Sequence, residues 1–197
     1  MTKQTILFIV IVLTTVYTTF GQDAYLDKGN KFLNNEQFEK AEQAFRKGIK
    51  FDSTNLIYQC QLGLTLIEQK KYDDAEIVLD KVLRKDSNNV AAIWYSGIGS
   101  FKGGQDRQAI TRFEKALTLL DKESGQYYSA NWFIGKSYSI LLKTEGLTYI
   151  ETDRMFSAYE EYLRLQPNAD DAEKIREYVE RKKKRRPTSN VLKWIDL

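Results

Sequence analysis

A spacing of 34 residues constrains this chain more than any other feature of its sequence. Small residues and large apolar residues recur three times at this spacing, in the sets Gly29, Gly63 and Gly97; Ala41, Ala75 and Ala109; and Phe45, Leu79 and Phe113. In each unit the glycine falls on the apolar stripe of one expected helix, and the alanine and the large residue fall on the stripe of a second. A single helix pair cannot bury its apolar face alone, so several pairs must stack. The repeat therefore predicts an all-α solenoid of stacked helix pairs.

The period and the pattern of small and large residues resemble those of the tetratricopeptide repeat, from residue 22 to about residue 171. The family elements appear as Leu62 and Gly63 with Leu66, and as Ala109, Phe113 and Ala116, while the family's terminal proline appears only in the fourth unit, at Pro167. The resemblance implies a right-handed superhelix in which the first helix of each pair lines a concave, protein-binding face. The expected segments are a signal peptide (1–21), repeats at 22–55, 56–89 and 90–123, an irregular repeat at 128–171, a capping helix with a basic end (172–186) and an apolar tail (187–197).

The fourth unit departs from the pattern by insertion. Gly135 follows Gly97 by 38 residues, and Met155 follows Gly135 by 20, where the corresponding distance in the first unit, Gly29 to Ala41, is 12. Either its helices are longer, or Gly146 marks a protruding loop. The extra residues are either a length change that a surface connection tolerates at little cost or an edge that contacts a partner.

The first 21 residues predict export. Lys3 precedes an apolar run from Ile6 to Val16, and Thr19 and Gly21 supply the small residues at which a signal peptidase cleaves. An uncleaved anchor is the alternative, but the run is short against the roughly 20 residues that span a bilayer. The expected location is the bacterial periplasm or cell envelope.

At 100° per residue, the face of each first helix that turns away from the glycine is expected to line the concave groove. The candidate partner-binding residues share this position: Leu26, Asn30, Leu33, Cys60, Leu64, Ile67, Trp94, Ile98, Phe101, Trp132 and Lys136. Relatives that clamp a peptide's terminal carboxylate use Lys, Asn and Arg on this face, and of these only Asn30 is present. The apolar groove instead predicts an apolar or amphipathic protein segment as ligand, unless these side chains merely pack adjoining helices.

The C-terminal region combines a basic run with an apolar end. Residues 181–197 carry seven Lys or Arg and one Asp, and the tail includes Val191, Trp194 and Ile195. Three interpretations remain open: the tail folds back on the solenoid, it docks on another protein, or with Arg181–Arg186 it touches an anionic membrane surface. Self-association through the fourth repeat or the tail is a further alternative. Nucleic acid is not an expected partner, because no aromatic residues interleave with the basic run.

The composition argues against catalysis. The chain has no histidine and one cysteine, which excludes imidazole-based acid–base pairs and an internal disulfide. Carboxylate pairs such as Asp73 and Asp74 precede apolar runs, where they stabilise helix N-termini. We therefore expect a protein-interaction adaptor with no catalytic, metal or cofactor-binding site.

Overall fold

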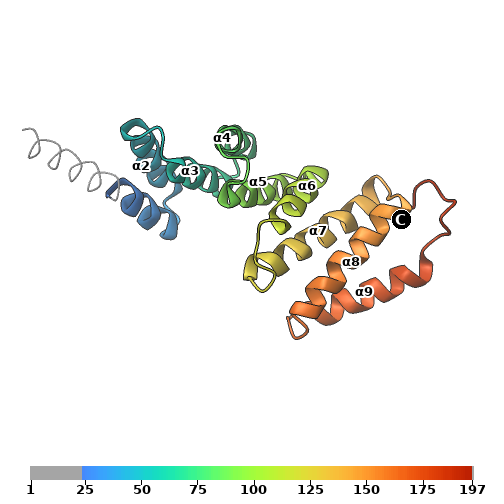
Figure 1. Ribbon diagram of the computed structural model, residues 1–197. Helices are drawn as coiled ribbons and strands as arrows, with labels where there is room; N and C mark the ends of the chain where they lie inside the picture. The colour runs from blue at the N-terminus through green and yellow to red at the C-terminus, as the bar shows by residue number, and fades with distance from the viewer. Residues whose placement is uncertain (1–23, 197) are drawn as a thin grey trace, which may run out of the picture. The chain divides into compact units, whose positions relative to one another are not determined.

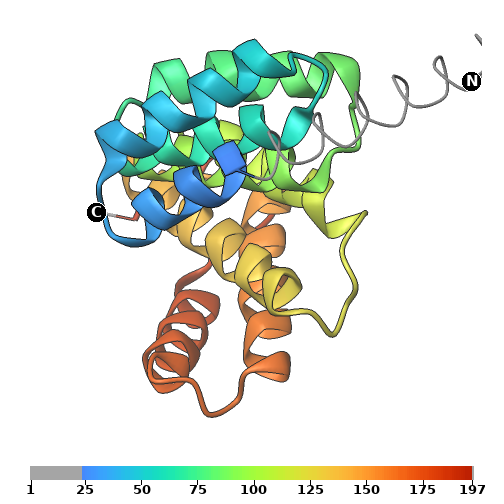
Figure 2. The same cartoon turned by 90° about the vertical axis from the view of Figure 1, so that its left-hand side faces the viewer.

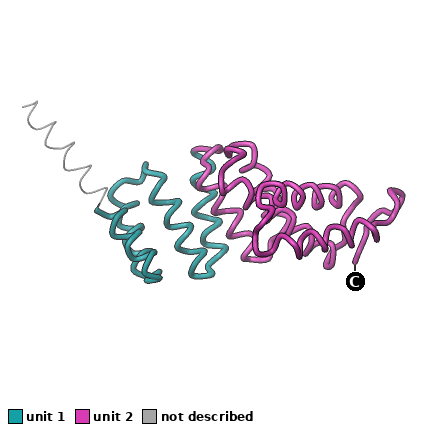
Figure 3. The backbone as a smooth tube through the Cα atoms, turned by 90° about the horizontal axis from the view of Figure 1, so that it is seen from below, with its two compact units in different colours: residues 1–85 teal, residues 86–197 magenta. Residues whose placement is uncertain are grey.

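The structure is a computed structural model that describes residues 24–196. The predicted signal peptide therefore lies outside the described residues. Every regular element of the described chain is an α-helix, which confirms the predicted fold class. The chain divides into two compact units, residues 1–85 and residues 86–197 (Figure 3), which are described separately below.

Unit 1 consists of consecutive helices that pack on their sequence neighbours (Figure 1). Residues 24–34 are helical, and they are followed by α2 (Phe38–Phe51), α3 (Leu56–Glu68) and α4 (Tyr72–Lys85). Asn55 caps α3 by accepting a hydrogen bond from the backbone N–H of Ile57, while Asp73 and Asp74 lie in the first turn of α4, as expected.

Unit 2 shows the same pairing, and two of its helices, α7 and α8, are longer than those of unit 1. Its elements are α5 (Val90–Lys102), α6 (Asp106–Leu117), α7 (Gly125–Thr144), α8 (Tyr149–Leu165) and α9 (Ala172–Arg185). Helices α8 and α9 lie side by side in both Figure 1 and Figure 2. A continuous apolar core runs through α6, α7, α8 and α9.

In each repeat, the glycine makes room for the large residue of the partner helix. A Cβ at Gly63 would lie 2.5 Å from Leu79, and a Cβ at Gly97 would lie 2.9 Å from Phe113. In the fourth repeat, a Cβ at Gly135 would lie 2.7 Å from Tyr159. These distances are too short for a real side chain, so glycine sets how closely the paired helices approach.

The insertion in the fourth repeat lengthens both helices and adds a turn. Helix α7 has 20 residues and α8 has 17, against 13 for α5 and 12 for α6. Gly146 ends α7 with a φ of +76°, a conformation that glycine adopts without strain. Thr148 and Glu151 then form a capping box that starts α8. Of the two alternatives, the structure shows longer helices; Gly146 lies in a short turn, residues 145–148, and not in a protruding loop.

The C-terminal tail folds back onto this turn (Figure 1). Leu147 and Trp194 exchange two backbone hydrogen bonds, of 2.9 and 2.8 Å, in an isolated antiparallel bridge. Trp194 packs against the core of unit 2, and the buried Lys182 ammonium pairs with the Asp196 carboxylate. Of the three interpretations of the tail, folding back is the one that the structure shows, and its site is the α7–α8 turn.

None of the helices in residues 24–196 is both long enough and apolar enough to cross a membrane.

Candidate interaction surface

An aromatic cluster joins α5, α6 and α7 in unit 2. Its members are Trp94, Phe101, Phe113, Trp132 and Phe133. Phe113 is completely buried, whereas the other four rings are partly buried. We call these four residues, Trp94, Phe101, Trp132 and Phe133, the aromatic face.

Phe133 holds the cluster together. Its ring stacks on Phe113 with centroids 4.8 Å apart and an interplanar angle of 5°. Phe101 and Trp132 meet it edge to face at 5.0 and 5.1 Å. Such pairs stabilise by about 0.5–1.5 kcal/mol each beyond their buried area, so the aromatic face is a rigid surface. The sequence prediction missed Phe133, because its place on the helix is 100° from the predicted groove position of Trp132.

Trp132 is also fixed through its indole nitrogen. Its Nε1–H donates a 2.7 Å hydrogen bond to Asp171 Oδ2, and the Tyr162 hydroxyl donates a 2.7 Å bond to Asp171 Oδ1. Asp171 is the N-cap residue of α9, but its side chain makes no cap hydrogen bond. Asp171 therefore ties α7 and α8 to the start of α9, and it gives the partly buried indole a structural partner.

A cleft of about 640 Å³ begins at Phe101. Its walls come from the α5–α6 turn and from the C-terminal half of α7, with Ile140 and Leu141 as apolar lining and Arg107 and Glu145 as charged lining. Phe101 belongs both to this cleft and to the aromatic face, so the two surfaces are continuous.

Asp106 lines the cleft but is itself buried. Its side chain is buried, yet Oδ1 has no hydrogen-bond partner among the described residues. Burial raises the pKa of the Asp106 carboxyl above its usual range, and the nearby Glu145 charge adds to this effect against the opposing influence of Ser137. Because buried polar atoms are nearly always hydrogen-bonded, the buried Ser137 hydroxyl is the donor expected to pair with this carboxylate.

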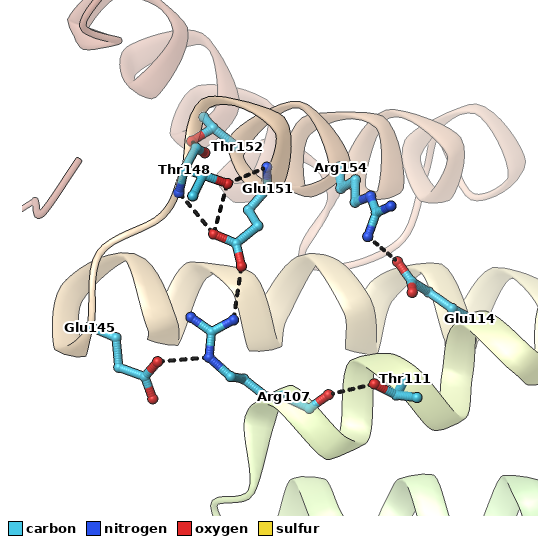
Figure 4. A network of polar contacts seen from close by, with 8 residues as sticks. All are labelled: Arg107, Thr111, Glu114, Glu145, Thr148, Glu151, Thr152 and Arg154. Atoms are coloured by element: carbon cyan, nitrogen blue, oxygen red, sulfur yellow. Dashed lines mark hydrogen bonds and ion pairs between the residues drawn. The ribbon is translucent and has the colours of Figure 1, made fainter. Parts of the chain in front are cut away.

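Arg107 fixes the rim of the cleft (Figure 4). Its guanidinium donates to Glu145 at the end of α7 and to Glu151 at the start of α8, each at 2.8 Å. Burial alone would raise the pKa of Glu151, but hydrogen bonds from Thr148 and Arg107 outweigh it and lower the pKa. One arginine thus links three helices and orients the Glu145 carboxylate at the cleft.

The predicted groove residues of unit 2 fall into two groups. Trp94, Ile98, Phe101 and Trp132 are partly buried; the first three pack against the core, and Trp132 contacts Phe101 and Phe133. Lys136 is exposed on α7. The structure therefore brings the predicted aromatic residues together, and whether they contact a partner stays a prediction.

The predicted groove residues of unit 1 are less accessible. Cys60 and Ile67 on α3 are buried, whereas Leu64 is partly buried. On the first helix, Leu26, Asn30 and Leu33 are partly buried. Their role as partner contacts is a prediction that burial makes weakest for Cys60 and Ile67. Within residues 24–196, no cluster of three His, Cys, Asp or Glu side chains could hold a metal ion.

Comparison with known proteins defines the class of this fold. The tetratricopeptide repeat family model matches residues 22–55 and 57–89. The helices of both units form sequential pairs of the same kind, and the family model matches the first two of the predicted repeats. Such domains generally bind proteins or peptides and are typically not enzymes.

Individual relatives are distant. The TPR repeat-containing protein MJ1428 of Methanocaldococcus jannaschii is 23% identical over 178 residues, which cover 79% of this chain but only 31% of the relative. The crystal structure of the MamA protein covers 87% of this chain and 98% of its own, with 22% identity and a TM-score of 0.64. The crystal structure of YrrB, a TPR protein with an unusual peptide-binding site, is 17% identical, covers 79% of this chain and 74% of its own, and has a TM-score of 0.62. At these identities the solved structures show the fold alone.

Proposed function

We propose that the protein is a non-enzymatic adaptor that binds an apolar or amphipathic segment of a partner protein on the aromatic face of unit 2. The observation that carries the proposal is the continuity of this face with the cleft at Phe101. Large aromatic side chains that are held rigid and partly exposed are the usual anchors of protein recognition, since they lose little conformational entropy on binding.

The cleft gives the proposed ligand a polar anchor at one end. A backbone N–H of the bound segment would donate to the exposed Glu145 carboxylate, while its apolar side chains would cover Phe101 and Ile98. This combination of an apolar surface with a few placed polar groups is typical of binding sites. The second domain of human RPAP3, which binds an HSP70 peptide, shares the fold at 21% identity and a TM-score of 0.51, covering 57% of this chain and 93% of its own.

The experiment is a selection of peptides from a displayed library on the immobilised protein, followed by affinity measurements on purified peptides. Phe101→Gln should weaken binding about tenfold or more, in line with the loss of a central aromatic anchor. Phe51→Gln is the matched control, because Phe51 is an exposed aromatic residue of unit 1 (47% exposed). Equal losses for the two variants would contradict the proposal.

We also propose that the adaptor acts in the bacterial cell envelope. The proposal is supported by the sequence of residues 1–21, in which a charged residue is followed by an apolar run and then by small residues. Fusion of the full chain to alkaline phosphatase, which is active only outside the cytoplasm, tests the proposal. An active fusion that becomes inactive when residues 1–21 are removed is expected, and an inactive full-length fusion would contradict it.

A further inference from the structure

The end of unit 2 at which the tail meets the α7–α8 turn exposes apolar side chains. Leu192 is 90% exposed, Ile150 68% and Ile195 51%, and Tyr149 and Val191 are also exposed. These five are most of the large exposed hydrophobic residues in the described chain, and they come from only two short segments, residues 149–150 and 191–195. Clustering of this kind indicates a contact surface, whereas scattered exposed apolar residues need no explanation.

Contacts within the fold hold the two segments at the same end. Ile195 lies against Gly146, three residues before Tyr149. The Arg186 guanidinium stacks on the Tyr149 ring at 3.4 Å and donates a 2.8 Å hydrogen bond to the Tyr149 carbonyl oxygen. The bridge between Leu147 and Trp194 fixes the tail itself.

The same end is strongly basic. Residues 181–196 hold seven Lys or Arg residues, and the carboxylates that pair with them are Asp196, Glu160 and Asp153. Lys184 and Lys193 make no ion pair within residues 24–196. Electrostatic attraction to a charged surface acts over a Debye length of roughly 10 Å, so these cations need not lie in one plane with the apolar side chains.

We propose that this end of unit 2 is a docking surface for an anionic lipid bilayer. We call it the amphiphilic end and define it by Tyr149, Ile150, Leu192, Lys193 and Ile195 together with the basic last turn of α9. Basic groups attract acidic headgroups, and apolar side chains enter the headgroup boundary.

The shape and the charge of the surface favour a bilayer over a protein. Leu192 is 90% exposed and protrudes from the surface, and Ile150, which is 68% exposed, protrudes at the rim of an open cleft beside α8. A fluid bilayer accepts protruding groups, whereas a protein partner needs matching pockets. A second copy of the chain, joined by two-fold symmetry, would bring two basic ends together, and like charges would oppose that contact.

Binding to vesicles tests this proposal independently of peptide binding on the aromatic face. The full chain is labelled with an environment-sensitive fluorophore at Ser189→Cys in the tail. A second protein is labelled at Ser53→Cys in unit 1 as the matched control position. Both serines are exposed, whereas the native Cys60 is buried, so the label reacts at the introduced cysteine. Vesicles contain phosphatidylcholine alone or mixed with an equal amount of phosphatidylglycerol. A blue shift at position 189, with none at 53, is expected only with the anionic vesicles. This label reports on the tail even if the N-terminal apolar segment also binds lipid.

Substitutions separate the two contributions. Lys184→Gln with Lys193→Gln should lower the partition coefficient on anionic vesicles about 25-fold, since each basic residue near such a surface contributes roughly fivefold. Leu192→Ser with Ile195→Ser should lower it at least about tenfold. Ile77→Ser is the matched apolar control, because Ile77 is 55% exposed in unit 1. No shift at 189, an equal shift with neutral vesicles, or a dimer in light scattering that Leu192→Ser with Ile195→Ser abolishes would each overturn the proposal.

Discussion

The backbone N–H of Trp194 donates a 2.8 Å hydrogen bond to the carbonyl oxygen of Leu147, and the N–H of Leu147 returns a 2.9 Å bond to Trp194. These two residues are far apart in the sequence, and their pairing closes the fourth helix pair with the end of the chain. The Asp196 N–H bonds to the Leu142 carbonyl oxygen at 3.1 Å and extends the attachment. Trp194 and Asp196 therefore attach the tail to the fold of unit 2.

Replacing Trp194 should destabilise unit 2. Trp194→Ala removes a partly buried ring that packs on the core and should lower the free energy of unfolding by about 2–3 kcal/mol, below the range for a fully buried tryptophan. The three tryptophans, Trp94, Trp132 and Trp194, all lie in unit 2, so the fluorescence of the two that remain follows the unfolding of this unit in urea. Leu192→Ala, at the most exposed apolar residue of the tail, should cost less than about 0.5 kcal/mol. An equal effect of the two substitutions would show that the tail is not docked.

Gly146 offers a test of the tail contact that leaves the tail intact. Gly146 and Gly104 have nearly the same φ, +76° and +75°, but a Cβ at Gly146 would lie 2.6 Å from Ile195 while a Cβ at Gly104 would meet nothing within 4 Å. Both alanine substitutions should lower the free energy of unfolding by about 1–2 kcal/mol, because alanine is strained in the left-handed backbone conformation. Gly146→Ala should cost about 1–3 kcal/mol more because it also displaces the tail.

The control for this prediction is a chain that lacks residues 188–197. In that background Gly146→Ala and Gly104→Ala should become equally costly in urea unfolding. If the extra cost at Gly146 persists without the tail, its source is another contact.

Glu151 should make the stability of unit 2 depend on pH. Its pKa is lowered in the folded protein, because hydrogen bonds from Thr148 and Arg107 outweigh the effect of burial. A carboxylate with a lowered pKa stabilises the fold above its unfolded pKa, and this contribution disappears as the pH falls through the folded pKa. Glu151→Gln should therefore lower the free energy of unfolding by about 1 kcal/mol at pH 7 and change it very little near pH 3.

Urea unfolding at the two pH values measures the difference. Glu177→Gln is the matched control, because Glu177 is exposed on α9 and makes no ion pair within the described chain. A cost for Glu151→Gln that is the same at pH 3 and pH 7 would show that the Glu151 charge does not support the fold.

The sequence predicts those parts of the fold that repeat. The spacing of Gly63 and Gly97 predicts close helix pairs, and both glycines do face the large residues of the partner helix, Leu79 and Phe113. Periodicity is sufficient here because each pair contacts near neighbours in the sequence.

The parts that do not repeat could not be predicted in this way. The pairing of Leu147 with Trp194 and the hydrogen bond from Trp132 to Asp171 join residues with no periodic relation. Asp171 precedes a helix, and its position alone predicts a role in helix capping. Its actual role depends on how α7, α8 and α9 converge, which only tertiary packing determines. The sequence did not predict the role of Phe133 for a related reason, because its ring joins the aromatic face through the stack on Phe113.

Site-specific photocrosslinking tests most directly whether the aromatic face binds a partner segment. Benzoylphenylalanine replaces Phe101 in one protein and Phe51 in another, and each is irradiated with a peptide selected on the unmodified chain. The account predicts a crosslink from position 101 that unlabelled peptide suppresses, and none from position 51. Crosslinking from position 51 alone, or from neither position while the peptide remains bound, would contradict it.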